Sequence, residues 1–271
     1  MNYHGAMTLP TLFISHGGGP WPWIDERRED FAGTFRWLQE LPATLPARPA
    51  AILSVSGHWE EQDFTVASSS HPPMVYDYYG FPDHTYRIEY SAPGLPSLAH
   101  RVRDLLGNAG IRIREDAERG FDHGTFVPLA VMYPNADVPV VSLSLRASLN
   151  ASEHVRMGAA LASLRDEGVL IVGSGLSYHN LRALRSSPSA GPVSETFETW
   201  LTRAVEEPDP ATRAELLSRW TEAPAARQAH PREEHLIPLM VAAGAAGSSA
   251  GRLAFRDHVW GVSMASYRFG D

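Results

Sequence analysis

Residues 11–20 read TLFISHGGGP, an apolar run followed at once by a histidine, three glycines and a proline. The run Thr11–Ser15 carries Leu, Phe and Ile side by side instead of alternating them with polar residues. Such a run is typical of a strand that is buried on both faces, as in parallel sheets. The glycines let the chain turn sharply where the strand ends. The segment therefore predicts a parallel strand that delivers His16 to one edge of a sheet.

The same pattern recurs along the chain and indicates the fold class. Further apolar runs predict strands at 50–56, 64–68, 138–145, 169–173, 252–258 and 262–269. Helical spacing predicts helices at 25–41, 97–107, 125–133, 152–167, 193–207, 210–220 and 232–246. This alternation predicts an α/β fold, with a mainly parallel central sheet flanked by helices on both faces and a terminal hairpin. Because no linker or repeat interrupts the pattern, we expect a single domain over residues 1–271.

The composition excludes several kinds of chemistry. The 271 residues include no cysteine, and all 23 basic residues are arginine. Without cysteine there is no thiol nucleophile, disulfide or thiolate metal site, and without lysine there is no Schiff base or Walker-type phosphate loop. A net charge of −8 argues against nucleic-acid binding. No apolar run is long enough for a membrane span, and residues 1–7 lack a signal-peptide layout, so we expect a cytoplasmic protein.

Histidine is the residue type that the composition leaves for chemistry, with twelve copies. His16, His58 and His179 each follow a predicted strand, directly or within a few residues. In an open α/β sheet, ligands bind outside the carboxyl ends of the strands. Imidazole is also the commonest metal ligand in proteins. The three histidines therefore predict a metal site at this edge of the sheet.

Two further histidines lie at predicted junctions between loops and helices. His123 comes just before the helix predicted at 125–133. His235 lies about one turn into the helix predicted at 232–246, from where it can point back at the sheet edge. We interpret the other histidines as structural or exposed: His4, His71, His84, His100, His154, His230 and His258.

Three other segments invite a functional interpretation. Ser174 lies between two glycines, but the G-x-S-x-G pattern of a hydrolase nucleophile is not met. The glycines at 17–19 lack the spacing of a nucleotide-binding loop. The aromatic segment at 76–84 has two interpretations: its rings line a pocket for an aromatic ligand, or they pack the loop onto the sheet.

Seven short segments carry a resemblance to a known family. They are SHGGGP at 15–20, SGHW at 56–59, YDYYGFP at 76–82, YSAPG at 90–94, GFDHG at 120–124, SYHN at 177–180 and EHLIPL at 234–239. In these segments the sequence resembles the class III extradiol ring-cleavage dioxygenases of the LigB superfamily, and most closely the single-chain DOPA 4,5-dioxygenase-like branch. The resemblance implies a non-haem Fe(II) enzyme that opens a catechol ring with O2. Its partners would be the catechol and O2, and it would be a monomer or small homo-oligomer.

The resemblance also implies roles for individual residues. His16 and His58 resemble metal ligands, and His235 resembles the third ligand. Its neighbour Glu234 is the alternative, since the two-subunit branch uses a carboxylate there. Three ligands on one face of the metal would leave positions for catechol and O2.

The remaining two histidines resemble an acid–base pair that flanks the substrate. His179 resembles the base that removes a catechol proton, and it is also a potential metal ligand in resting or zinc-substituted protein. His123 resembles the acid or hydrogen-bond donor that acts later in the reaction. Two other functions use the same residues: a zinc hydrolase that activates water, and a non-catalytic binding protein similar to the Memo-like members of the superfamily.

Overall fold

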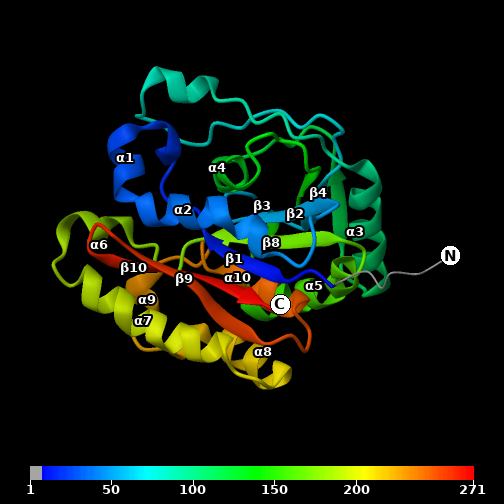
Figure 1. Ribbon diagram of the computed structural model, residues 1–271. Coiled ribbons are helices and arrows are strands. Elements are labelled where there is room, and N and C mark those ends of the chain that lie inside the picture. The colour runs from blue at the N-terminus through cyan, green and yellow to red at the C-terminus, as the bar shows by residue number, and fades with distance from the viewer. Residues whose placement is uncertain (1–7) are drawn as a thin grey trace.

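A six-stranded sheet lies at the centre of the structure, a computed structural model that describes residues 8–271 (Figure 1). The strand order is β6-β2-β8-β1-β10-β9. The bounds are β1 Thr11–Ser15, β2 Ala51–Ser56, β6 Val140–Ser142, β8 Val169–Gly175, β9 Gly251–Val259 and β10 Val262–Phe269. His4 and the segment on which the expectation about a signal peptide rests lie outside the described residues.

The sheet is parallel except at one edge, as the sequence predicts. Strands β6, β2, β8 and β1 run parallel, and every residue in them is buried. Burial on both faces explains why their sequences are continuous apolar runs without alternation. Strands β9 and β10 form a terminal hairpin, and β10 joins the sheet antiparallel to β1.

Helices cover both faces of this sheet (Figure 1). Helices α2 and α4 lie on one face, whereas α5, α7, α8 and α10 lie on the other. The bounds are α1 Asp25–Asp30, α2 Ala32–Glu40, α3 Pro96–Asn108, α4 His123–Met132, α5 Ala151–Ala160, α6 Leu181–Ser186, α7 Ala190–Val205, α8 Pro210–Ser218, α9 Ala226–Ala229 and α10 Ile237–Ala245. The α/β fold class is therefore confirmed. None of these helices has both the length and the apolar character needed to cross a bilayer.

Two small parallel sheets depart from the predicted strands. The strand predicted at 64–68 forms β4 (Phe64–Ala67), which pairs with β5 (Ile113–Asp116) and not with the central sheet. Strand β5 has one apolar residue followed by three charged ones over only four positions, so its sequence signal is weak. The strand predicted at 138–145 divides, because β6 ends at Ser142 and β7 (Leu145–Arg146) pairs with β3 (Glu60–Glu61).

Two predicted helices are interrupted in the structure. The helix predicted at 25–41 breaks at Phe31, whose buried ring stacks on Trp21 with the ring centroids 4.9 Å apart. The helix predicted at 152–167 continues beyond α5 only as a 3-10 turn at Ala162–Arg165. At Phe31, tertiary packing interrupts the helix where the apolar spacing continues.

The prediction that His235 lies within a helix is wrong. Helix α10 begins at Ile237, and His235 lies in the turn before it. Pro238 occupies the first turn of α10. A proline ring clashes with the carbonyl group four residues earlier if the helix continues, so residue 234 is excluded from the helix.

Candidate active site

The register of the central sheet places the first two predicted histidines at the same edge. Strands β1 and β2 flank β8 and end level with its Gly175 and Ser174. The backbone N–H of His16 donates to the Gly175 carbonyl over 3.0 Å, directly after β1. His58 follows β2 after one glycine. Both histidines therefore lie at the carboxyl ends of the two parallel strands that flank β8.

The third histidine reaches this edge because the strand ends carry glycines. A Cβ atom on Gly175 would lie 1.9 Å from the His235 carbonyl oxygen, and one on Gly57 would lie 2.9 Å from the Glu234 carbonyl oxygen. The N–H of Leu176 donates to the same His235 carbonyl over 3.0 Å. Because glycine has no Cβ atom, the backbone of the turn before α10 can pass in direct contact with the ends of these strands.

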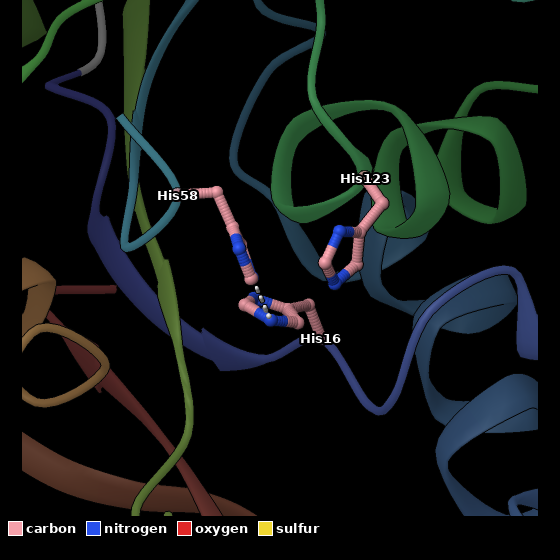
Figure 2. A group of neighbouring side chains, drawn as sticks. All are labelled: His16, His58 and His123. Carbon is pink, nitrogen blue, oxygen red and sulfur yellow. Dashed lines mark hydrogen bonds between the residues drawn. The ribbon is translucent and has the colours of Figure 1, made fainter. Parts of the chain in front are cut away.

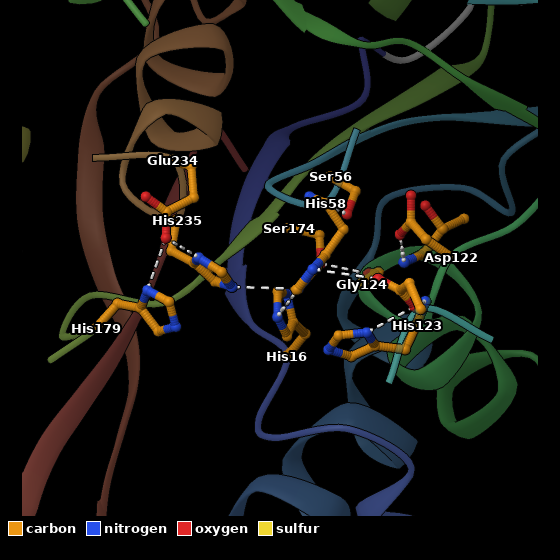
Figure 3. A network of polar contacts seen from close by, with 12 residues as sticks. His16, Ser56, His58, Asp122, His123, Gly124, Ser174, His179, Glu234 and His235 are labelled. Atoms are coloured by element: carbon orange, nitrogen blue, oxygen red, sulfur yellow. Dashed lines mark hydrogen bonds and ion pairs between the residues drawn. The ribbon is translucent and has the colours of Figure 1, made fainter. Parts of the chain in front are cut away.

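At this edge the Nε2 atom of His58 lies close to the Nε2 atoms of two other histidines. His58 Nε2 lies 3.2 Å from His16 Nε2 and 3.1 Å from His235 Nε2 (Figure 3). A metal bound about 2.0–2.1 Å from each nitrogen places neighbouring ligand nitrogens about 3.0–3.4 Å apart. The spacings from His58 to each of the other two imidazoles thus fit ligands of a single metal ion.

A serine orients the His16 ring. Ser174 Oγ donates its one proton to the Gly124 carbonyl and therefore accepts from His16 Nδ1 over 3.0 Å. The His16 ring then carries its proton on Nδ1, and the lone pair on Nε2 is free.

Carboxylates face the same nitrogen of the other two rings. Asp77 Oδ2 lies 3.2 Å from His58 Nδ1, and Glu234 Oε1 lies 2.9 Å from His235 Nδ1. A carboxylate oxygen favours the proton on the imidazole nitrogen that it faces, which leaves Nε2 unprotonated. Three Nε2 lone pairs that face one another without a proton between them form a donor set suited to a cation.

The histidines of this centre are neutral at neutral pH. Burial, followed by repulsion from neighbouring histidines, lowers the pKa values of His16 and His235 well below the usual 6.5. Burial and the proximity of His123 lower the pKa of His58 to about 4. Their lone pairs are therefore available to a metal without displacing protons.

The histidine predicted as a base lies beside this centre. The His179 ring stacks on that of His235, with centroids 3.5 Å apart, and about a fifth of its side chain is exposed. Its Nδ1 lies 2.8 Å from Glu234 Oε1 (Figure 3). Burial by itself raises the pKa of Glu234, but the contacts with His179, the backbone and Arg232 together lower it.

The histidine predicted as an acid lies on the opposite side, at the first position of α4. The His123 ring approaches that of His58, with centroids 3.9 Å apart (Figure 2). Its Nδ1 and its backbone N–H each lie 2.9 Å from Asp77 Oδ1. Burial by itself raises the pKa of Asp77, but the contacts with His123 dominate and lower that pKa to about 2.

The five histidines form two neighbouring groups. Two sets have their ligand atoms within 4.8 Å of one another: His16, His58 and His123, and separately His179, Glu234 and His235. His123 is thus within reach of a metal, which the sequence did not predict. The Nε2 contacts of 3.1–3.2 Å instead link His58 to His16 and His235.

The aromatic loop packs against this site through its own contacts. The hydroxyl of Tyr76 donates to the Ile88 carbonyl over 2.7 Å, and that of Tyr78 donates to the Thr85 carbonyl over 2.5 Å. The Tyr78 ring lies edge-on to His123, with centroids 5.9 Å apart. These hydroxyls hold the loop in place, as the packing interpretation expects.

The family comparison agrees with this arrangement. The family described as the catalytic LigB subunit of aromatic ring-opening dioxygenase matches residues 10–269. The chain belongs to the LigB family. The resemblance seen in the sequence is therefore confirmed, and this LigB-family protein is an extradiol ring-cleavage dioxygenase, a metal-dependent enzyme that acts on a small aromatic molecule and O2.

Individual relatives cover most of the LigB-family chain. It is 39% identical to a 4,5-DOPA dioxygenase extradiol of Beta vulgaris, over 96% of both chains. It is 37% identical to a protein of the same name from Escherichia coli (strain K12), over 88% of this chain and 85% of the relative. The crystal structure of an uncharacterized Escherichia coli K12 protein superposes with a TM-score of 0.77 at 32% identity, over 97% of this chain and 100% of the other.

Sequence reasoning missed two residues of this LigB-family site. Asp77 lies within the aromatic motif, where only the rings drew attention. Ser174 was considered solely as a nucleophile, whereas its hydroxyl contacts His16. Proximity in sequence gives no signal for either contact, because His58 lies 19 residues before Asp77 and His16 lies 158 residues before Ser174.

Proposed function

We propose that the enzyme holds Fe(II) on the Nε2 atoms of His16, His58 and His235. The observation that carries this proposal is that His58 Nε2 lies 3.1–3.2 Å from the Nε2 atoms of His16 and His235, while Nδ1 of each of the three rings faces an acceptor. When bound, the iron supplies a Lewis-acidic, redox-active centre for the catechol and O2. Glu234 is the weaker candidate for third ligand, because its Oε1 already lies against two histidines.

His179 is the proposed base. Its Nδ1 faces Glu234, so its Nε2 is the atom free to accept a catechol proton. The carboxylate stabilises the imidazolium that results, and partial exposure lets the ring meet a substrate. Because His179 stacks on His235, the proton acceptor lies directly beside a proposed ligand. The same position makes it a potential additional ligand when zinc occupies the site.

His123 is the proposed acid, on the other side of His58. Asp77 accepts from its Nδ1, which stabilises the protonated ring. In that form its Nε2–H is free to donate to an oxygen of the substrate. The helix backbone fixes the ring, because the same carboxylate also accepts from the His123 N–H.

The proposed substrate is a catechol. DOPA is the first candidate, because curated relatives are named 4,5-DOPA dioxygenase extradiol. Caffeate, protocatechuate-like acids and simple catechols complete the panel. We expect anaerobic Fe(II) loading followed by O2 to produce the yellow absorbance of ring-opened semialdehydes with at least one of them. Zinc-loaded protein should remain inactive; catechol-independent hydrolysis by the zinc form would favour a hydrolase.

Two substitutions separate the proposed roles. We expect His179→Ala to retain iron and lose most ring cleavage, because the base is removed while the three ligands remain. We expect His16→Ala to lose the metal. His258→Ala is a matched control, because that imidazole is exposed on β9. Full activity of His179→Ala on every accepted catechol would refute its assignment as the base.

A further inference from the structure

Two carboxylates in the site share one arrangement that the proposed roles leave unexplained. Each lies between two histidines, of which one is a proposed metal ligand and the other a proposed proton-transfer residue. Figure 3 shows Glu234 in this position, with both His179 and His235 against it. Asp77 lies in the same way between His58 and His123.

Asp77 uses both of its oxygens. Oδ1 accepts from the backbone N–H and from Nδ1 of His123, each over 2.9 Å, and Oδ2 lies 3.2 Å from His58 Nδ1. The two neighbours of Asp77 in the sequence are themselves held in place, because the hydroxyls of Tyr76 and Tyr78 donate to backbone carbonyls. Asp77 is therefore a bridge that accepts two hydrogen bonds from His123 on Oδ1 and places Oδ2 beside His58 Nδ1.

Glu234 uses a single oxygen for the same purpose. Oε1 lies 2.8 Å from His179 Nδ1 and 2.9 Å from His235 Nδ1. Oε2 is buried and accepts no hydrogen bond within residues 8–271, although Arg232 Nη1 lies 3.5 Å away. Its second oxygen is thus dispensable for the bridge.

We propose that Asp77 and Glu234 are positioning residues, each of which holds a proton on Nδ1 of one metal ligand and of one proton-transfer histidine, so that both Nε2 atoms face the reaction centre. The inference rests on the proposed function for the roles of the four histidines. The two bridges make the metal site and the proton-transfer residues one connected unit. Removing a bridge therefore perturbs a ligand and a proton-transfer residue together.

The two bridges respond differently to an amide. Asp77→Asn keeps one acceptor oxygen, and the two His123 contacts hold it at the Oδ1 position. Its NH2 group then faces His58 Nδ1, donor against donor. Glu234→Gln keeps the oxygen that contacts both histidines and changes only the Oε2 position. Each variant removes one negative charge beside one proposed metal ligand. A difference in zinc affinity between the two variants therefore reports the loss of the bridging contact and not the loss of charge.

The test measures metal affinity and imidazole tautomers. Zn(II) affinity of the metal-free variants comes from competition with a chromophoric chelator, and tautomers of the zinc-loaded protein come from long-range 1H–15N NMR of labelled histidines. We expect Asp77→Asn to bind zinc about 10–100-fold more weakly than wild type and to lose the Nδ1–H signal of His58. Glu234→Gln should keep the Nδ1–H signals of His179 and His235 and lose much less affinity. Equal affinities of the two amide variants, with an unchanged His58 tautomer, would overturn the proposal.

A second pair of variants covers the case in which Asp77→Asn does not fold. Glu234→Ala removes the acceptor that Glu234→Gln retains, so we expect about 10–100-fold weaker zinc binding in the alanine variant. Equal zinc affinity of these two would also overturn the proposal. Neither readout uses ring cleavage. If iron-loaded wild type opened no catechol while the variants differed as stated, the proposed function would fail and the bridges would stand.

Discussion

Gly124→Ala is a sharp test of how tightly the metal site is packed. A Cβ atom at this position in α4 would lie 2.3 Å from Ser56 Oγ and 2.9 Å from His58 Cδ2. Cδ2 is the ring atom bonded to Nε2, the proposed metal-binding nitrogen. The His58 ring cannot retreat freely, because Asp77 faces its other nitrogen. The added methyl group therefore acts directly on the position of a metal ligand.

The expected magnitudes for Gly124→Ala separate stability from metal binding. Replacing glycine by alanine stabilises a helix by up to about 1 kcal/mol, the full value applying to interior positions, whereas Gly124 is the second residue of α4. Inserting a methyl group into a packed core costs about 1–3 kcal/mol. The free energy of unfolding of metal-free protein should therefore fall by about 0–3 kcal/mol. Relieving the contact requires His58 to move by about 0.5 Å or more, beyond the tolerance of a metal site, so zinc affinity should fall at least about tenfold.

The assay combines urea unfolding of the metal-free protein with zinc competition against a chelator. Gly107→Ala in α3 is the matched control, because a Cβ atom there meets no atom within 4 Å. We expect the control to gain up to about 1 kcal/mol of stability with unchanged zinc affinity. Wild-type zinc affinity in Gly124→Ala would refute the reasoning that His58 is held against α4.

The remaining predictions concern three other side chains. Burial lowers the pKa of His154 to about 4, so between pH 6.5 and 4 the unfolded chain binds a proton that the native state does not. This proton uptake should reduce the free energy of unfolding by about 2 kcal/mol from pH 7 to pH 5. In urea unfolding at the two pH values, the free energy of unfolding of His154→Gln should fall by about 2 kcal/mol less than that of wild type. Ser174→Ala leaves His16 Nδ1 without its acceptor, so zinc affinity should fall about 10–100-fold in chelator competition; unchanged affinity would contradict the role of the hydroxyl. His123→Ala should slow ring cleavage while catechol binding, measured by anaerobic titration, is preserved; loss of catechol binding would refute its role as an acid.

Sequence predicted the parts of the fold that depend on local patterning. The apolar runs Thr11–Ser15 and Ala51–Ser56 identify buried parallel strands, and the rule for strand ends then places His16 and His58 at one edge. The helix at 25–41 was predicted as continuous because the apolar spacing continues through Phe31. Packing of that ring on Trp21, which interrupts the helix, is a tertiary contact with no local signal.

The features of the site that the sequence did not predict also depend on contacts without a local sequence signal. Apolar spacing predicts His235 inside a helix, although Pro238 in the first turn keeps α10 from beginning before Ile237, two residues after His235. Asp77 and Ser174 act through the Nδ1 atoms of histidines distant in sequence. Which nitrogen of each imidazole faces the metal depends on these contacts, so residue types alone could identify the histidines but not their orientation.

Anomalous diffraction from crystals of the iron-loaded protein, grown without O2, tests the central claim most directly. We predict one peak at the iron edge, about 2.0–2.2 Å from the Nε2 atoms of His16, His58 and His235. A peak bound by His16, His58 and His123, or one coordinated by the Glu234 carboxylate in place of His235, would contradict the account.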